Sequence, residues 1–306
     1  MSANRSHDLP ACVRHPDRPT GLRCVRCDRP ACPDCLREAS VGYQCVDCVN
    51  EGARTVRAPR TVGGARTATR GSRSLVVVPA LIAVNVAAFV LTAAQAGSVT
   101  QNDRSSVFLD GALVPAFVAA GEWWRLITSG FLHFGNYGGF GPVHLLFNMF
   151  ALWVIGRDLE VALGRLRFIG VYLLSLLGGS TAVMLFGDPG GGVAGASGAV
   201  YGLFGGIAVV VFRSKLNPAP VLTLIAINIV LSFTLPGISL LGHVGGLLAG
   251  ALASAAMVYA PPARRTQVQL GTCVVLLVAM VVAVTVRSIS MDCAAIGLQI
   301  YCGGVG

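Results

Sequence analysis

The chain has 306 residues, of which 54% are hydrophobic and only 12% are charged. A mean hydropathy of +0.69 excludes an ordinary soluble protein and predicts a polytopic membrane protein. The formal net charge of +9 does not predict a nucleic-acid partner, because thirteen arginines precede Ser74 and most other basic residues lie between apolar runs. We expect the lipid bilayer as the partner. The bias toward Arg, Ala and Gly suggests a bacterium, and hence a bacterial plasma membrane.

Cysteine and histidine dominate residues 8–50. Four ligand pairs, each with a two-residue gap, are present: Cys12 and His15, Cys24 and Cys27, Cys32 and Cys35, Cys45 and Cys48. Such a gap lets a tight turn direct both side chains at one ion, and eight ligands make two tetrahedral zinc sites. The close spacing favours an interleaved arrangement, in which the first pair joins the third and the second joins the fourth, similar to B-box or RING-like modules.

This segment is therefore predicted to be a small cytosolic module with two structural zinc ions. So few residues bury little apolar surface, and the metal is expected to supply the folding energy. Disulfides are the alternative, which a reducing cytosol disfavours. We expect a cytosolic protein to be the partner of this module. Residues 51–73 combine Arg, Thr, Gly and Pro with almost no large apolar side chain, which predicts a flexible basic linker.

Seven apolar runs follow, and each is long enough to cross a hydrocarbon core of about 30 Å. Together they make residues 74–288 an all-α membrane domain, and the predicted spans are 75–96, 143–163, 168–187, 195–212, 220–236, 238–260 and 270–287. A cytosolic N-terminus places twenty of the twenty-three basic residues on the inner side. The tail 289–306 is then external, where Cys293 and Cys302 either form a disulfide or remain free thiols.

In this orientation the second, fourth and sixth spans all run from the outer to the inner side. They place His144, Ser197 and His243 at a similar shallow depth, as an active site requires. Ser197 is the candidate nucleophile and His243 the candidate base. No acidic residue lies at this depth, so packing must orient His243, and Tyr201, one turn beyond Ser197, can support its ring. The alternative for His243 is a core histidine bonded to a neighbouring helix.

His144 and Asn148 are also one helical turn apart. Two donors on one face can stabilise a developing oxyanion together with the backbone N–H of Ser197, and Gly195 is assigned to the same site. The alternative is a polar contact that only joins helices. The Gly246-x3-Gly250 spacing predicts a close helix contact that brings Ser197 and His243 together.

These motifs resemble the rhomboid family of intramembrane serine proteases. The residues that carry the resemblance are Glu122, Trp124 and Arg125; His144 and Asn148; Gly195, Ser197, Gly198, Tyr201 and Gly202; and His243, Gly246 and Gly250. The resemblance implies a six-helix core with an extra seventh helix, a Ser–His dyad, an oxyanion site that includes His144 and Asn148, and supporting roles for Trp124 and Arg125. It also implies a first outer loop lying partly in the membrane, and cleavage of single-span substrates near the outer face without a catalytic cofactor.

Two features depart from the family pattern. A glycine-rich insert over residues 135–142 lies beside the predicted oxyanion site, and the zinc module is an addition that the catalytic core does not need. A non-catalytic relative that binds transmembrane helices is the alternative function. Such relatives are expected to lack Ser or His, and here both are present.

Overall fold

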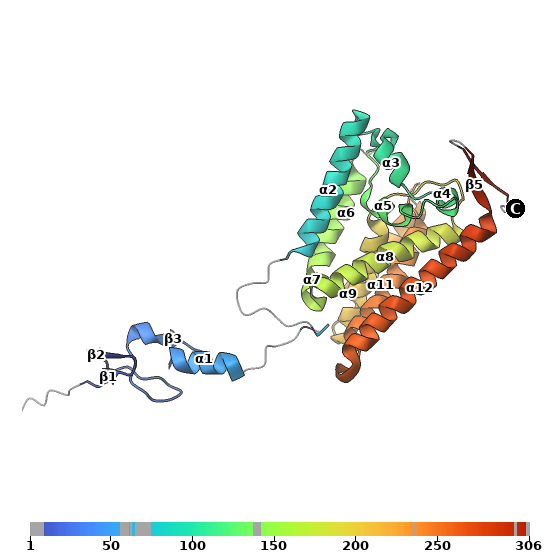
Figure 1. Ribbon diagram of the computed structural model, residues 1–306. Helices are drawn as coiled ribbons and strands as arrows, with labels where there is room; N and C mark the ends of the chain where they lie inside the picture. Colours follow the sequence, from blue (N-terminus) through green and yellow to red (C-terminus); the bar gives the residue numbers. More distant parts are fainter. Residues whose placement is uncertain are drawn as a thin grey trace, which may run out of the picture. The chain divides into compact units, whose positions relative to one another are not determined.

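The computed structural model describes residues 9–55, 61, 63–64, 75–136, 142–234, 237–296 and 299–303. The glycine-rich insert predicted over 135–142 therefore lies largely outside the described residues. The chain divides into two compact units, Met1–Pro59 and Arg60–Gly306, and each is described by itself (Figure 1).

The N-terminal unit consists of two small antiparallel hairpins and one helix. Strand β1 (Ala11–Cys12) pairs with β2 (His15–Pro19), and β3 (Leu36–Glu38) pairs with β4 (Tyr43–Cys45). Helix α1 (Val46–Thr55) follows and continues five residues beyond residue 50, into the segment predicted as a linker. The buried core contains six cysteines, and its other members are only Ala31 and Leu36. An apolar core of two residues cannot hold this unit together, which leaves the cysteine side chains to do so.

The second unit is helical, as predicted. Its helices in chain order are α2 (Val77–Ala96), α3 (Ser106–Gly111), α4 (Pro115–Ala119), α5 (Arg125–Thr128), α6 (Val143–Ala151), α7 (Arg157–Leu163), α8 (Arg165–Phe186), α9 (Ser197–Arg213), α10 (Ala219–Thr234), α11 (Leu240–Tyr259) and α12 (Arg265–Met291). The predicted spans correspond to α2, α6 with α7, and α8 to α12. The second span is one continuous path in which a π-helical turn, Leu152–Gly156, joins α6 to α7.

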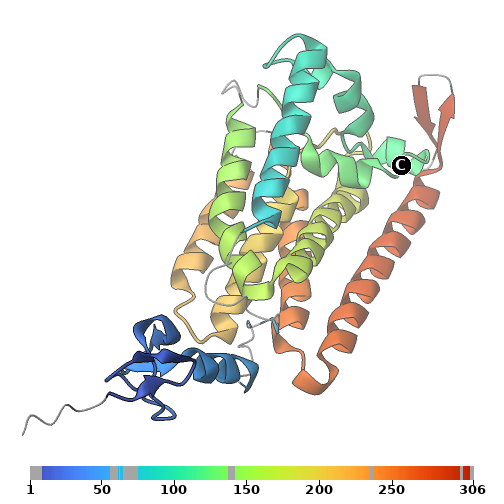
Figure 2. The ribbon, with the colours of Figure 1, turned by 60° about the vertical axis from the view of Figure 1, so that its left-hand side comes forward.

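Helices α8, α9 and α11 form the centre of this unit, where they pack against one another. In α8, 67% of the most apolar window is buried, against 11% in the segment that contains α12. Helix α12 accordingly runs along the outside of the bundle (Figure 2). By length and composition, α2, α8, α11 and α12 can cross a membrane, while α9 and α10 are shorter apolar helices. The fold is that of an integral membrane protein.

A buried carboxylate marks the start of α2. Glu160, on α7, is 4% exposed and accepts hydrogen bonds from the N–H groups of Val76, Val77 and Val78 at 2.9–3.1 Å. These groups have no partner within the helix, and a negative charge is favoured at this end of the helix dipole. Glu160 therefore caps α2 from a distant part of the sequence.

The C-terminal segment forms a hairpin. Strands β5 (Cys293–Ile296) and β6 (Gln299–Cys302) pair in a register that sets Cys293 opposite Cys302, and the two cysteines form a disulfide. The hairpin lies at the end of α12 and contacts α4 of the loop between α2 and α6 (Figures 1 and 2). Of the two alternatives for these cysteines, the structure has the disulfide, and the predicted tail contains ordered strands.

Candidate active site and metal centre

Ser197 is the first residue of α9. Ala196, the residue at the helix N-cap, provides no side-chain hydrogen bond, and the first N–H groups of a helix have no intrahelical acceptor. Gly195, just before it, has a φ of +145°, and a Cβ there would lie 2.8 Å from Cε1 of His144. A side chain at position 195 would displace the His144 ring. The glycine thus allows the His144 ring to lie beside the nucleophile.

The predicted oxyanion residues differ in their donors. The N–H of Gly195 donates to the carbonyl of Ser129 at 2.9 Å, so Gly195 contributes space to the site and its N–H is already used. Asn148 donates one amide hydrogen to the carbonyl of His144 at 2.9 Å and retains a second one. His144 and Asn148 occupy successive turns of α6, as the sequence predicted.

His243 lies on α11 and is 6% exposed. Its ring stacks on the ring of Tyr201 with centroids 3.8 Å apart and an interplanar angle of 13°. A Cβ built on Gly246 would collide with the backbone of Gly198, so α9 and α11 are in backbone contact one residue past Ser197. In the described part of the chain, Ser197 and His243 are not hydrogen-bonded to each other. Catalytic hydrogen bonds are often long before substrate binds.

The other side of the His243 ring contacts α10. The Nδ1 of His243 is 2.7 Å from Oγ of Ser232, which is itself 5% exposed. Ser232 and the hydroxyl of Tyr201 both donate to the carbonyl of Asn228 at 2.8 Å. Sequence reasoning missed Ser232, since a serine in an apolar helix carries no motif and the contact crosses from one helix to the next.

A cavity of about 30 Å³ adjoins Ser197. Its lining is small and partly polar, with hydroxyl groups from Ser129, Ser180 and Ser239. The volume admits a water molecule or a small side chain next to the nucleophile.

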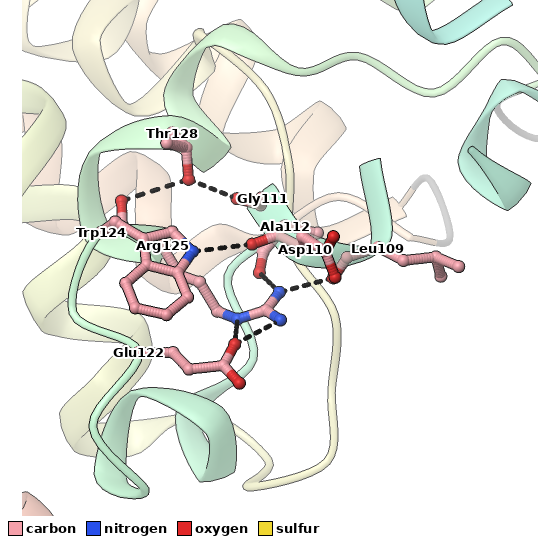
Figure 3. A network of polar contacts seen from close by, with 8 residues as sticks. All are labelled: Leu109, Asp110, Gly111, Ala112, Glu122, Trp124, Arg125 and Thr128. Atoms are coloured by element: carbon pink, nitrogen blue, oxygen red, sulfur yellow. Dashed lines mark hydrogen bonds and ion pairs between the residues drawn. The ribbon is translucent and has the colours of Figure 1, made fainter. Parts of the chain in front are cut away.

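Trp124 and Arg125 lie in the loop between α2 and α6 (Figure 3). Arg125 is 3% exposed. Its guanidinium pairs with Glu122 at 2.6 Å and donates to the carbonyls of Leu109 and Ala112 at 2.6 and 2.8 Å. The indole of Trp124 donates to the carbonyl of Asp110 at 2.9 Å. Both side chains therefore hold one segment of this loop, residues 109–112, and their predicted supporting role remains a prediction.

The next residue, Leu113, is bonded to the stretch that leads into Ser197. Leu113 and Val193 exchange two backbone hydrogen bonds of 2.9 and 2.8 Å. The N–H of Ala196 also donates to Nε2 of His133 at 3.3 Å. His133 is fully buried and is a second residue that sequence reasoning missed, although it belongs to the same short stretch as His144. Contacts from this loop thus fix the backbone that leads into Ser197.

The N-terminal unit contains two clusters of metal-ligand side chains. Cys12, His15, Cys32 and Cys35 form one, and Cys24, Cys27, Cys45 and Cys48 form the other, with all ligand atoms of a cluster within 4.8 Å of one another. This is the predicted interleaved arrangement of first with third pair and second with fourth.

The geometry fits a tetrahedral ion. The Nδ1 of His15 lies 3.3, 3.4 and 3.9 Å from the Sγ atoms of Cys35, Cys32 and Cys12. Zinc bonds of about 2.0–2.3 Å separate neighbouring tetrahedral ligands by roughly 3.5–3.8 Å. Desolvation and the neighbouring Cys32 and Cys12 raise the pKa of the Cys35 thiol to about 11. Metal-ligating thiols are deprotonated, and the positive charge of a divalent cation would offset the repulsion between neighbouring thiolates.

Fold and site together define an integral helical membrane protein with a serine at a helix start and a histidine on the helix packed against it. The family model of the Rhomboid domain matches residues 120–260. The rhomboid protease GluP of Bacillus subtilis (strain 168) is 34% identical over 181 residues, 58% of this chain. YdcA of the same organism is 38% identical over 142 residues, which cover 45% of this chain and 68% of YdcA. The chain belongs to the rhomboid family.

The matched residues cover different shares of the relatives' lengths. The matched residues make up 34% of GluP, while the rhomboid protease AarA of Providencia stuartii is 26% identical over 216 residues, 59% of this chain and 72% of AarA. The match to the family model begins at residue 120, so the two cysteine clusters lie outside it.

Proposed function

We propose that this protein is an intramembrane serine endopeptidase that cleaves single-span membrane proteins near the outer membrane face. Membership of a family whose named relatives include the proteases GluP and AarA supports this function. The observation that carries it is the contact between α9 and α11, in which Tyr201 stacks on His243 while Gly198 and Gly246 meet backbone to backbone.

In the proposed mechanism, Nε2 of His243 takes the proton of Ser197 as Oγ attacks the scissile carbonyl carbon. The resulting oxyanion is stabilised by the N–H of Ser197, by His144 and by the remaining amide hydrogen of Asn148. The imidazolium then protonates the leaving amine, which leaves an acyl ester on Ser197. A water molecule, activated by the same His243, attacks the ester and releases the second product. These steps use only the chain's own residues.

We further propose a bacterial plasma-membrane location with a cytosolic N-terminus and an external C-terminus. The distribution of basic residues supports this orientation. The Cys293–Cys302 disulfide supports it as well, since disulfides persist in oxidising compartments. The cysteine clusters, at the other end of the chain, suit a reducing compartment, where they would hold two structural zinc ions and could recruit a cytosolic protein partner.

The test is cleavage of a single-span reporter by the purified full chain. Wild type should cut the reporter, while Ser197→Ala and His243→Ala should each reduce the rate by at least about 10³-fold, as for loss of a nucleophile or its base. Equal thermal stability of all three proteins would show that the variants fold.

A wild-type protein that folds but cuts none of several reporters would contradict the proposal. If it instead retained the uncut reporter helix in a pull-down, the non-catalytic binder would become the better interpretation.

A further inference from the structure

The α10 helix places a hydroxyl group directly on the ring nitrogen of His243 that faces away from α9. The distance from Ser232 Oγ to Nδ1 is 2.7 Å, and both residues are buried. In a serine protease triad a carboxylate occupies this position, where it fixes the tautomer and the orientation of the histidine. Asp158 and Glu160 lie on α7, and Glu160 caps α2, so neither serves His243.

We infer that Ser232 is a positioning residue, which accepts a hydrogen bond from the Nδ1–H of His243 and so keeps Nε2 unprotonated and directed at Ser197. This inference rests on the proposed function, since it assigns the residue that prepares the base of the dyad.

The count of protons favours one direction for the hydrogen bond between Ser232 and His243. Four short contacts connect Tyr201, Ser232, His243 and the carbonyl of Asn228: Tyr201 to Asn228 at 2.8 Å, Tyr201 to Ser232 at 2.9 Å, Ser232 to Asn228 at 2.8 Å and Ser232 to His243 at 2.7 Å. The two hydroxyl groups supply one proton each, and the carbonyl supplies none. If Nδ1 carries no proton, only two protons are available for the four contacts, so two contacts place lone pairs against each other. If Nδ1 carries a proton, three contacts are hydrogen bonds and one contact remains without a proton.

The Ser232 hydroxyl donates its proton to the carbonyl of Asn228, one turn earlier on α10. With that proton engaged, the lone pairs of Oγ face Nδ1 and accept from it. Tyr201 closes the arrangement from α9, since its ring covers His243 and its hydroxyl shares the Asn228 carbonyl. Packing by Tyr201 sets the plane of the imidazole, and Ser232 sets its rotation within that plane and its tautomer.

The kinetic test compares Ser232→Ala, which removes the hydroxyl, with Ser232→Thr, which keeps it. Ser175→Ala is the matched control, because Ser175 is another fully buried serine whose hydroxyl donates to the carbonyl four residues earlier, that of Val171. We expect Ser232→Ala to lower kcat by about 3- to 10-fold, the effect of one neutral hydrogen bond, with KM unchanged. Ser232→Thr should recover most of kcat, and Ser175→Ala should keep the wild-type value.

A spectroscopic measurement tests the same inference without catalysis. In the full chain labelled with ¹⁵N-histidine, the signals of His243 are identified by their loss in His243→Gln. We expect a protonated Nδ1 and an unprotonated Nε2 in wild type, and a mixture of both tautomers in Ser232→Ala.

The inference is overturned if wild-type His243 carries its proton on Nε2, or if Ser232→Ala behaves like Ser175→Ala in an active enzyme. If wild type cuts nothing, the proposed function fails while the tautomer measurement still decides the role of Ser232. If wild type cleaves the reporter and Ser232→Ala keeps the same kcat, the proposed protease function is retained and Ser232 has no positioning role.

Discussion

Gly250 shows how single residues set the distance between α9 and α11, the helices that hold the proposed dyad. A Cβ built at this position on α11 would collide with the backbone of Gly202 on α9. Gly246, one turn earlier, stands in the same relation to Gly198. Since no side chain lies between the two backbones here, the separation of Ser197 and His243 depends on the absence of two Cβ atoms.

Gly250→Ala is expected to force α9 and α11 apart. Overpacking of this kind costs about 1–3 kcal/mol of stability, and the wider spacing should lower reporter cleavage by at least about tenfold. Thermal unfolding and cleavage rates of the purified protein measure both effects. Gly170→Ala on α8 is the control, because a Cβ there meets nothing within 4 Å. If Gly250→Ala matches this control, the close contact does not set the geometry of the site.

At the scale of elements, α2 depends on a residue that is far away in the sequence. Glu160 accepts three N–H groups at the start of α2 and is buried among them. Without the carboxylate these donors would lose their acceptor at a helix end where Val77 and Val78 are buried, which is costly. Helix α2 contacts α6 and α8, so the loss should be felt throughout the membrane unit.

Glu160→Ala should therefore destabilise the protein by about 2–4 kcal/mol, from the loss of hydrogen bonds to a buried charged group. Asp158→Ala is the control, because Asp158 lies on the same helix with its side chain 65% exposed and forms an ion pair with its neighbour Arg157. The midpoint of thermal unfolding in one detergent compares the two. A shift in Asp158→Ala as large as that in Glu160→Ala would argue against the cap.

The sequence predicted helices well where a long apolar run alone determines the structure. The apolar runs of α8, α11 and α12 had to span a membrane, and their predicted limits lie within five residues of the observed ones. The helical turns within the outer loop, α3 to α5, and the β5–β6 hairpin were not predicted. These short elements depend on tertiary contacts, such as those of Arg125 with the carbonyls of Leu109 and Ala112.

The same contrast applies to the site. Ser197, His243, Tyr201 and His144 could be proposed from the sequence because a nucleophile needs glycines beside it and because the predicted spans alternate in direction. Ser232 could not be found in this way, since its role depends on contacts between helices, with His243 at 2.7 Å and with Tyr201 at 2.9 Å.

At the scale of the whole molecule, the N-terminal unit is organised by ligand pairing and the membrane unit by burial. The interleaved arrangement of the cysteine clusters followed from the two-residue gaps and the short spacers between pairs. Since the core of this unit contains only Ala31 and Leu36 besides cysteine, its stability should depend on the metal.

The purified full chain should contain two zinc ions, and paired substitutions should reveal which ligands share an ion. Cys12→Ser with Cys32→Ser removes two ligands of one cluster and should leave one zinc per chain. Cys12→Ser with Cys24→Ser touches both clusters and should leave none, because losing one of four ligands greatly weakens a structural site. Elemental analysis gives the stoichiometry. Equal zinc content in the two double variants would contradict the interleaved pairing.

Metal removal by a chelator should also make residues 9–55 sensitive to protease while the membrane unit keeps its thermal transition. Loss of the membrane transition on chelation would show that the two units do not fold independently.

The C-terminal hairpin contains a disulfide, whereas the N-terminal unit contains free thiols in two clusters. This difference affects how the chain must be inserted during biosynthesis. One end of the chain needs oxidised sulfur and the other needs reduced sulfur. Under the proposed orientation, a molecule inserted the other way round would expose the seven N-terminal thiols to oxidants and leave Cys293 and Cys302 without their disulfide. A misinserted chain would thus have structural defects at both termini, which the proteolytic quality control of the cell can recognise.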